Sequence, residues 1–138
     1  MMNEKNKLVL ATTEDLRMEL VNHHRQNASK FKRALCVCSA GMLRSATLAW
    51  ILSNDPYNYN VRAAGTEDYA LVPVDRVLLE WADVVFFAEK SHKSKVFDKF
   101  GPLNKTWYVM SAPDDYEFRD PELVRYLEMK LHNFDLCP

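Results

Sequence analysis

Short apolar runs alternate with amphipathic segments along most of this chain, and this alternation limits the folds that it can adopt. An apolar run at residues 34–38 precedes a helical pattern at 45–52, and a run at 83–88 precedes a helical pattern at 91–100. The run at 83–88 is apolar at consecutive positions, which is typical of parallel strands covered on both faces. Strands that alternate with helices indicate an α/β fold, in which helices cover both faces of a parallel sheet.

Further segments extend the same pattern toward the C-terminus. We expect strands at residues 60–64 and 106–110, with a helix at 72–81 between them. The last helix has the clearest start, because Asp120 is suited to the cap position and Pro121 to the first helical position. All of these segments fit one α/β domain.

The N-terminal part of the chain is expected to lie outside this domain. Residues 14–27 have the spacing of an amphipathic helix, so we predict an extra N-terminal helix. We therefore divide the chain into an N-terminal extension, residues 1–30, and an α/β domain, residues 31–138. We expect this helix either to pack on the domain or to mediate association; the sequence does not say which, and the oligomeric state stays open.

Composition argues against several classes of protein. Eighteen Lys and Arg against nineteen Asp and Glu create no overall field for nucleic acid or acidic membranes, so neither is an expected partner. No apolar run approaches the roughly 18 residues of a membrane span. Three cysteines are an odd number and indicate no disulfide framework, so we expect a reduced, cytoplasmic protein.

The segment from Cys38 to Ser45 has the pattern with the clearest chemical meaning. Cys38 closes a predicted buried strand, and Arg44 stands six positions later at the start of a predicted helix. Helix N-termini present unpaired N–H groups and partial positive charge. An arginine guanidinium can donate two parallel hydrogen bonds to two phosphate oxygens. Small residues allow successive amides to curl around an anion. We predict an anion-binding loop formed by Ser39, Ala40, Gly41, Met42 and Leu43.

The electropositive loop also favours the nucleophilic thiolate form of Cys38. Ser45 can donate a hydrogen bond to this thiolate and to the cysteine as it leaves in a second step. Cys36 lies two residues upstream on the same strand and is expected in the core, since such positions are poorly placed for a disulfide. We therefore predict that Cys38, Arg44 and Ser45 are catalytic residues.

Attack on an ester with a poor leaving group needs a proton donor as well as a thiolate. Asp114 and Asp115 follow the strand predicted at 106–110, so they should reach the sheet edge that also carries Cys38. Adjacent acids oppose each other's ionisation, which helps to keep one protonated. We assign Asp114 as the acid with Asp115 as the alternative, and expect Tyr116 to stack on an aromatic substrate.

These motifs, in this order, resemble the low-molecular-weight protein tyrosine phosphatase family. The similarity covers residues 33–131 and looks most like the short prokaryotic and phage branch. The segments that carry it are residues 38–45, 63–66, 82–89, 113–116 and 120–123.

The resemblance implies a three-layer α/β fold with a central four-stranded parallel sheet and a phosphatase that uses no metal or other cofactor. Cys38 would attack phosphorus while Arg44 and the loop amides bind its oxygens. Asp114 would protonate the leaving phenolate and then activate water. The implied substrate is a phosphotyrosine protein or a small aryl phosphate, and the loop would also bind inorganic phosphate or sulfate.

Three features depart from the family pattern. The family usually has Asn at the position of Gly41, where it braces the loop, and many members have a second cysteine at the position of Leu43. This second cysteine protects the nucleophile by forming a disulfide. The family also usually begins close to its first strand, without the N-terminal extension of this chain.

Two alternative functions stay open. Arsenate reduction on the same fold needs further thiols, and the other cysteines are Cys36 and Cys137. A non-catalytic phospho-binding module would keep the anion loop without turnover, and Gly41 motivates this alternative.

Overall fold

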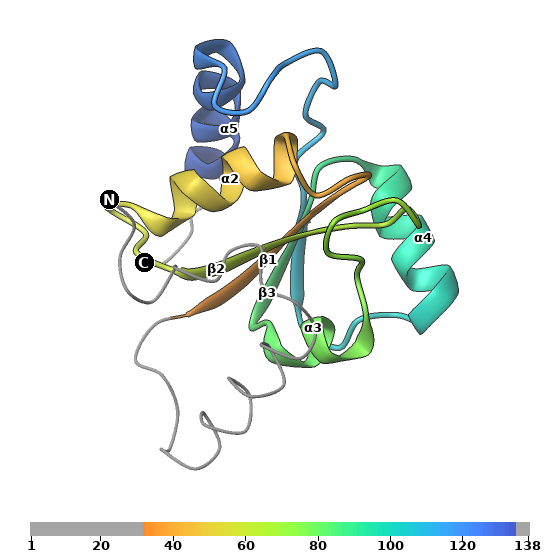
Figure 1. Ribbon diagram of the computed structural model, residues 1–138. Helices are drawn as coiled ribbons and strands as arrows, with labels where there is room; N and C mark the ends of the chain where they lie inside the picture. Colours follow the sequence, from red (N-terminus) through yellow and green to blue (C-terminus); the bar gives the residue numbers. More distant parts are fainter. Residues whose placement is uncertain (1–31, 135–138) are drawn as a thin grey trace.

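The computed structural model describes residues 32–134, which form a four-stranded sheet covered by helices (Figure 1). Every pairing in this sheet is parallel, and the strand order is β2-β1-β3-β4. The expected three-layer α/β fold is therefore confirmed. The elements of the described chain are β1 Arg33–Cys38, α2 Arg44–Ser53, β2 Asn60–Gly65, α3 Arg76–Trp81, β3 Val84–Phe87, α4 Lys90–Phe100, β4 Thr106–Val109 and α5 Pro121–Asn133.

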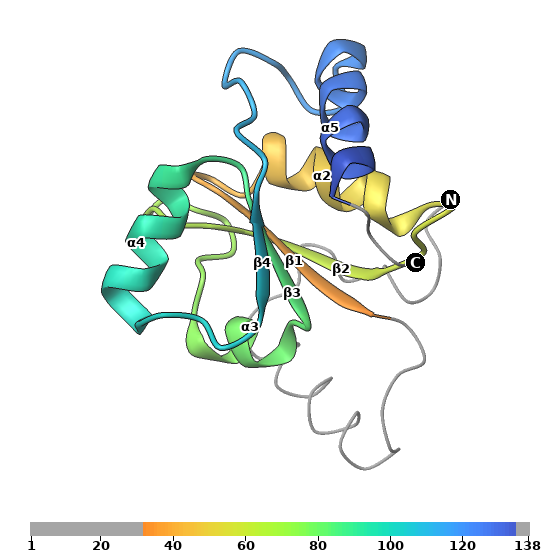
Figure 2. The same cartoon turned by 180° about the vertical axis from the view of Figure 1, so that it is seen from behind.

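Two apolar cores lie on opposite faces of the sheet because consecutive strand residues point to opposite sides. In β1, Ala34 and Cys36 face the core formed with α2 and α5, whereas Leu35 and Val37 face the core formed with α3 and α4. Figure 2 shows these two pairs of helices on the two sides of the sheet. Every residue of β3 is buried, as its unbroken apolar run predicts.

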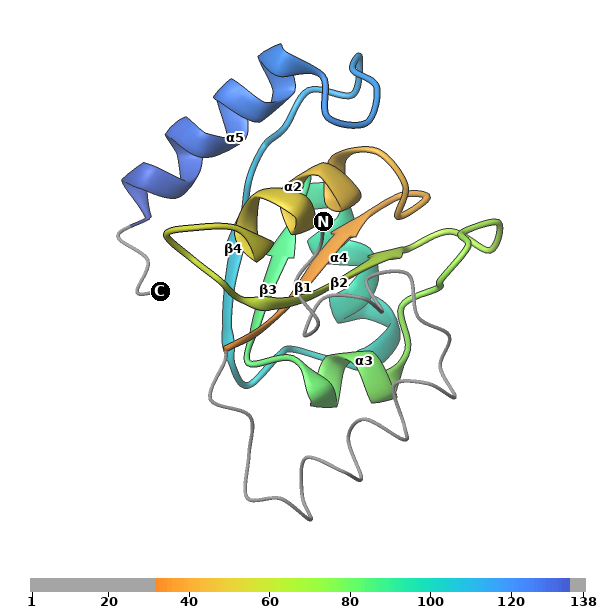
Figure 3. The same ribbon diagram turned by 60° about the vertical axis from the view of Figure 1, so that its left-hand side comes forward.

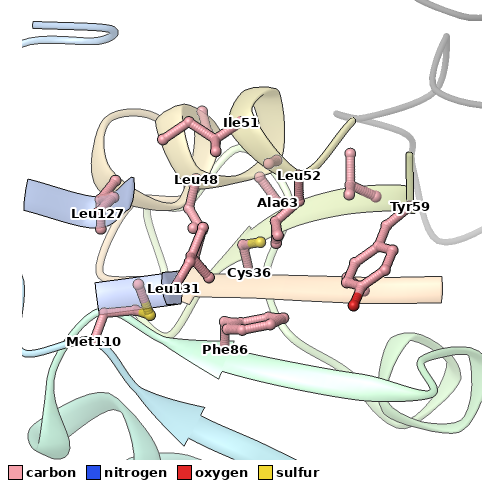
Figure 4. Packing of buried hydrophobic residues seen from close by; sticks show 14 of the residues in the cluster. Cys36, Leu48, Ile51, Leu52, Tyr59, Ala63, Phe86, Met110, Leu127 and Leu131 are labelled. Atoms are coloured by element: carbon pink, nitrogen blue, oxygen red, sulfur yellow. The ribbon is translucent and has the colours of Figure 1, made fainter. Parts of the chain in front are cut away.

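The core beneath α2 and α5 holds the helix that follows the Cys38 loop (Figure 4). Leu48 and Leu52 of α2 pack with Leu127 of α5 and Phe86 of β3, and each of these side chains is at most 2% exposed. Burial of one leucine stabilises a fold by about 1.5–3 kcal/mol. This packing fixes α2 on the sheet, and with it the first turn that carries Arg44.

Helix α3 begins at Arg76, later than the helix predicted at residues 72–81. Val72 accepts a hydrogen bond from the Gly65 N–H, and the Val74 N–H donates one to the Gly65 carbonyl. This segment therefore extends along the end of β2 before the chain turns into α3. The apolar residues that suggested a longer helix are buried by strand-like pairing, so the predicted start was wrong.

The other predicted strands and helices within the described residues lie within one residue of their expected bounds. The α5 start is confirmed in detail, because the Asp120 carboxylate accepts from the Glu122 N–H and Pro121 occupies the first turn. The predicted helix at 14–27, the whole extension at 1–30, and Cys137 lie outside the described residues.

Two loops that carry predicted site residues meet at the carboxyl edge of the sheet. Figure 3 shows the β1–α2 loop and the β4–α5 loop at the same end of the strands. The Arg44 guanidinium in the first turn of α2 contacts Asp114 and the Ala112 carbonyl in the second loop. In open α/β sheets, this is the edge at which ligands bind.

Candidate active site

Cys38 is the last residue of β1, and its sulfur lies beside the start of α2. The Gly41 N–H donates a hydrogen bond to Cys38 Sγ at 3.1 Å, and Ser45 Oγ lies 3.1 Å from the same sulfur. Leu43, at the N-cap of α2, has no side-chain oxygen to cap the helix. The positive end of α2 therefore has no side-chain cap and favours an anion nearby. The Gly41 N–H is a donor to the sulfur, and the Ser45 hydroxyl can either donate to the sulfur or accept from it.

Gly41 is required by the shape of the loop. Its φ is 77°, and a Cβ at this position would lie 2.8 Å from the backbone carbonyl carbon of Ala64. Asparagine tolerates a positive φ, but its Cβ would still meet the backbone of β2. The glycine that departs from the family pattern therefore matches a loop that packs directly on the end of β2.

Backbone hydrogen bonds brace the loop where a side chain at position 41 cannot. The Thr66 N–H donates to the Cys38 carbonyl at 2.9 Å, and the Glu67 N–H donates to the Ser39 carbonyl at 3.1 Å. Gly65 permits this approach, because a Cβ on it would lie 2.3 Å from the Ser39 carbonyl oxygen. The chain after β2 therefore holds the nucleophile and the residue that follows it.

Arg44 is 4% exposed and has partners from two other elements. Its Nη1 lies 2.8 Å from Glu89 Oε1 and donates to the Ala112 carbonyl at 3.2 Å, while its Nη2 lies 3.3 Å from Asp114 Oδ1. Burial raises the pKa of Glu89, but the hydrogen bond and charge of Arg44 outweigh it and hold this pKa below its ordinary value. The guanidinium is therefore held in place next to the loop.

Asp114 and Asp115 lie in different surroundings. The Asp114 carboxylate faces Arg44, and its side chain is 71% exposed, which leaves it open to solvent and to an incoming substrate. Asp115 is exposed. The geometry therefore favours Asp114 as the acid, although the assignment itself stays a prediction.

The hydroxyl group of Tyr116 points toward α5. The Tyr116 hydroxyl donates to Glu122 Oε2 at 3.0 Å, and this hydrogen bond and the charge of Glu122 raise the pKa of Tyr116. Its ring packs against the core beneath α2 and α5. A stacking role for Tyr116 stays a prediction.

The remaining loop residues differ in exposure. Met42 is 52% exposed and Leu43 is 42% exposed, so both present apolar surface at the start of α2. Ser39 and Ala40 are half-buried. The structure thus brings together a sulfur, a buried arginine, a carboxylate and an apolar rim.

His92 contacts the loop through its side chain. Its Nε2 lies 3.0 Å from Ser39 Oγ, and the Glu89 N–H donates to its Nδ1 at 3.0 Å. The histidine is 1% exposed. Sequence reasoning gives neither His92 nor Glu89 a role in the site. Glu89 and His92 have the i, i+3 spacing of a capping box at the start of a helix. This spacing is the signal that could have indicated a structural role for both residues.

Cys36 has the core position that the sequence predicts. It is fully buried, and burial followed by the charge of Cys38 raises its pKa far above the ordinary cysteine value. Within residues 32–134, no group of three or more His, Cys, Asp or Glu side chains could hold a metal ion. In the same part of the chain, no helix is long and apolar enough to cross a membrane.

A solved structure with the same fold is the crystal structure of a YwlE mutant from Bacillus subtilis. It matches this chain with a TM-score of 0.53 and 20% sequence identity, over 75% of this chain and 99% of that chain. The chain has the fold of YwlE. No protein-family model matches the sequence, and no curated protein does so either. This similarity establishes the fold, and the chemistry must be inferred from the site.

Proposed function

We propose that this protein hydrolyses phosphate monoesters through a cysteinyl-phosphate intermediate and is a protein tyrosine phosphatase of the low-molecular-weight family. The observation that carries the proposal is the position of buried Arg44. Its guanidinium lies at the start of α2, next to the Cys38 loop, and contacts Asp114 from another loop. The proposed anion site, the proposed nucleophile and the proposed proton donor thus lie at one sheet edge.

In the first step, Cys38 Sγ attacks phosphorus as a thiolate. A sulfur–phosphorus bond forms while the bond from phosphorus to the phenol oxygen breaks. Asp114, protonated at this stage, gives its proton to that oxygen, and the phenol leaves. Arg44 and the amides at the start of α2 bind the phosphoryl oxygens, where negative charge must be stabilised.

In the second step, Asp114 takes a proton from water, and the water oxygen attacks phosphorus. The sulfur–phosphorus bond breaks, inorganic phosphate forms, and Cys38 returns as a thiolate. Ser45 Oγ, 3.1 Å from the sulfur, is placed to donate to it as it leaves. The products are one phenol and one phosphate for each ester and water consumed.

The proposed substrate is an aryl phosphate, either a phosphotyrosine protein or a small molecule. The exposed Met42 and Leu43 present apolar surface beside the loop, and a phenyl ring can pack on such surface. Inorganic phosphate or sulfate is a further proposed ligand of the loop. A thiolate nucleophile also favours a reducing compartment, so we extend the proposal to the cytoplasm.

The test is hydrolysis of p-nitrophenyl phosphate by reduced protein with EDTA present. We expect Cys38→Ala to abolish turnover and the matched control Cys36→Ala, on the same strand, to retain it. A burst of p-nitrophenolate before the steady state would support the covalent intermediate. Normal turnover by Cys38→Ala would refute the mechanism.

The two alternative functions predict different results. A phospho-binding module would bind inorganic phosphate without hydrolysing p-nitrophenyl phosphate. An arsenate reductase would turn over arsenate with a thiol reductant and lose this activity on Cys137→Ser, because Cys36 is fully buried and poorly placed for disulfide exchange.

A further inference from the structure

His92 joins the start of α4 to the loop that follows the nucleophile. Its Nδ1 accepts from the Glu89 N–H at 3.0 Å, and its Nε2 lies 3.0 Å from Ser39 Oγ. The two contacts engage both ring nitrogens of a side chain that is 1% exposed. Ser39 is the residue directly after Cys38, so this ring links α4 to the anion loop.

The backbone contact determines where the ring proton lies. An amide N–H can only donate, so His92 Nδ1 must accept with a lone pair. In the neutral ring, the proton then sits on Nε2, and Nε2–H donates to Ser39 Oγ. His92 therefore cannot act as a base toward the Ser39 hydroxyl, which excludes a serine–histidine nucleophile. Its role is to hold Ser39.

We propose that neutral His92 is a positioning residue of the anion loop, and that protonation of its ring releases the loop from α4. This inference rests on the proposed function, because the loop in question is the proposed phosphate site. A protonated ring would carry N–H at Nδ1 and direct it at the Glu89 N–H. Two donors cannot bond each other, so the ring or the first turn of α4 must move.

Glu89 extends the consequence to the arginine. The residue whose amide bonds His92 Nδ1 also pairs with Arg44 through its carboxylate, at 2.8 Å. Movement of the first turn of α4 would therefore disturb Arg44 as well as Ser39. One titrating ring is thus connected to both parts of the anion site.

Charged groups from three elements surround this ring. Burial lowers the pKa of His92, and the positive charges of Arg44 and Lys95 lower it further, against the opposing effect of Glu89 and Asp114. His92 is therefore neutral at neutral pH, and the tie to Ser39 is present there. It is lost as the pH falls through this lowered pKa.

Gly41 explains why the loop needs such a tie. A side chain at that position would collide with the backbone of Ala64, so a brace from residue 41 is excluded. Ser39 supplies a side-chain contact on the other side of the loop. The loop thus combines backbone support from the chain after β2 with side-chain support from α4.

The test is sulfate binding by calorimetry, with full-length reduced protein and EDTA present. Sulfate keeps its double charge at mildly acidic pH, so its own titration does not confuse the result. His92→Asn keeps an oxygen near the Nδ1 position for the Glu89 N–H but removes the donor to Ser39. His92→Gln, with the same amide group, places a donor near the Nε2 position. Ser39→Ala removes the acceptor.

We expect His92→Asn and Ser39→Ala each to weaken sulfate binding at neutral pH about 2- to 10-fold, as for the loss of one hydrogen bond. His92→Gln should recover part of this loss. Because both single changes remove the same bond, the double variant should bind no more weakly than the weaker single variant. As the pH falls through the lowered pKa of His92, the advantage of wild type over His92→Asn in sulfate binding should shrink.

Equal sulfate affinity of wild type and His92→Asn at neutral pH would overturn the inference. A tighter binding of sulfate by wild type that does not change with pH would also overturn it. Nitrogen NMR showing the neutral ring protonated at Nδ1 would also overturn it. If His92→Asn does not fold, Ser39→Ala provides the binding comparison and wild-type NMR the proton position. Sulfate binding without p-nitrophenyl phosphate hydrolysis would refute the phosphatase proposal and leave the His92 inference intact.

Discussion

Arg44 Nη2 lies 3.3 Å from Asp114 Oδ1, so the arginine that is proposed to bind phosphate contacts the aspartate that is proposed to donate the proton. The Asp114 side chain is 71% exposed, and water weakens such a pair. Glu89 and the Ala112 carbonyl hold Nη1. A phosphoryl group can therefore displace Asp114 from Nη2 while the guanidinium keeps its position.

This competition predicts opposite effects of Asp114→Asn on turnover and on binding. Turnover of p-nitrophenyl phosphate should fall about 10²- to 10⁴-fold, because the general acid is lost. Inorganic phosphate should bind more tightly, because a carboxylate no longer competes for Arg44. The measurements are kcat and the inhibition constant of inorganic phosphate.

Asp115→Asn is the matched control for this experiment, because it changes the same group one residue away. Its kcat and phosphate inhibition constant should stay close to those of wild type. If Asp115→Asn loses turnover while Asp114→Asn keeps it, the acid is Asp115 and our assignment is wrong.

A pair of glycine variants tests the packing of the loop on β2. Gly41 and Gly101 both have positive φ, so alanine should strain the backbone by about 1–3 kcal/mol at each. At Gly41 the new Cβ would also meet Ala64 at 2.8 Å, whereas nothing lies within 4 Å at Gly101. Overpacking should add about 1–3 kcal/mol at Gly41. Urea unfolding measures both, and equal losses would contradict the role of this contact.

The ion pair of Glu89 with Arg44 predicts a pH dependence of stability. The folded-state pKa of Glu89 lies below its ordinary value, so the pair stabilises the fold at neutral pH. This contribution is lost as the pH falls through the lowered pKa, and Glu89→Gln should lack it. The difference in unfolding free energy between wild type and Glu89→Gln should therefore shrink on acidification. Glu117→Gln, at an exposed position, is the control for the loss of one negative charge.

The two described cysteines should react differently with iodoacetamide. Burial raises the pKa of Cys36, so it stays an unreactive thiol, whereas Cys38 lies at the anion loop. Peptide mapping by mass spectrometry should find Cys38 labelled before Cys36, and inorganic phosphate should slow the labelling of Cys38. Cys36→Ala should cost about 1 kcal/mol of stability and leave turnover close to normal. Faster labelling of Cys36 would contradict this assignment.

Local patterns were sufficient to predict most of the described strands and helices. The start of α5 needs only Asp120 and Pro121, which are neighbours in sequence. The start of α3 could not be predicted in this way. Val72 and Val74 hydrogen-bond to Gly65, and this partner on β2 becomes adjacent only after folding.

The candidate site shows the same division. Cys38, Arg44 and Ser45 lie within one strand–loop–helix segment, so their spacing and order were readable. The tie from His92 to Ser39 joins residues 53 positions apart, and no local pattern contains it. The sequence could supply only the capping-box spacing of Glu89 and His92.

The alternation of strands and helices, and the loop that carries Cys38 and Arg44, are readable from the amino-acid sequence. Local hydrogen bonding and side-chain periodicity specify such features within a few residues. The contact between Asp114 and Arg44, the need for glycine at position 41 and the contact between His92 and Ser39 arise only in the folded chain. Each of these features depends on distances between elements. Those distances are set by the packing of helices on both faces of the sheet.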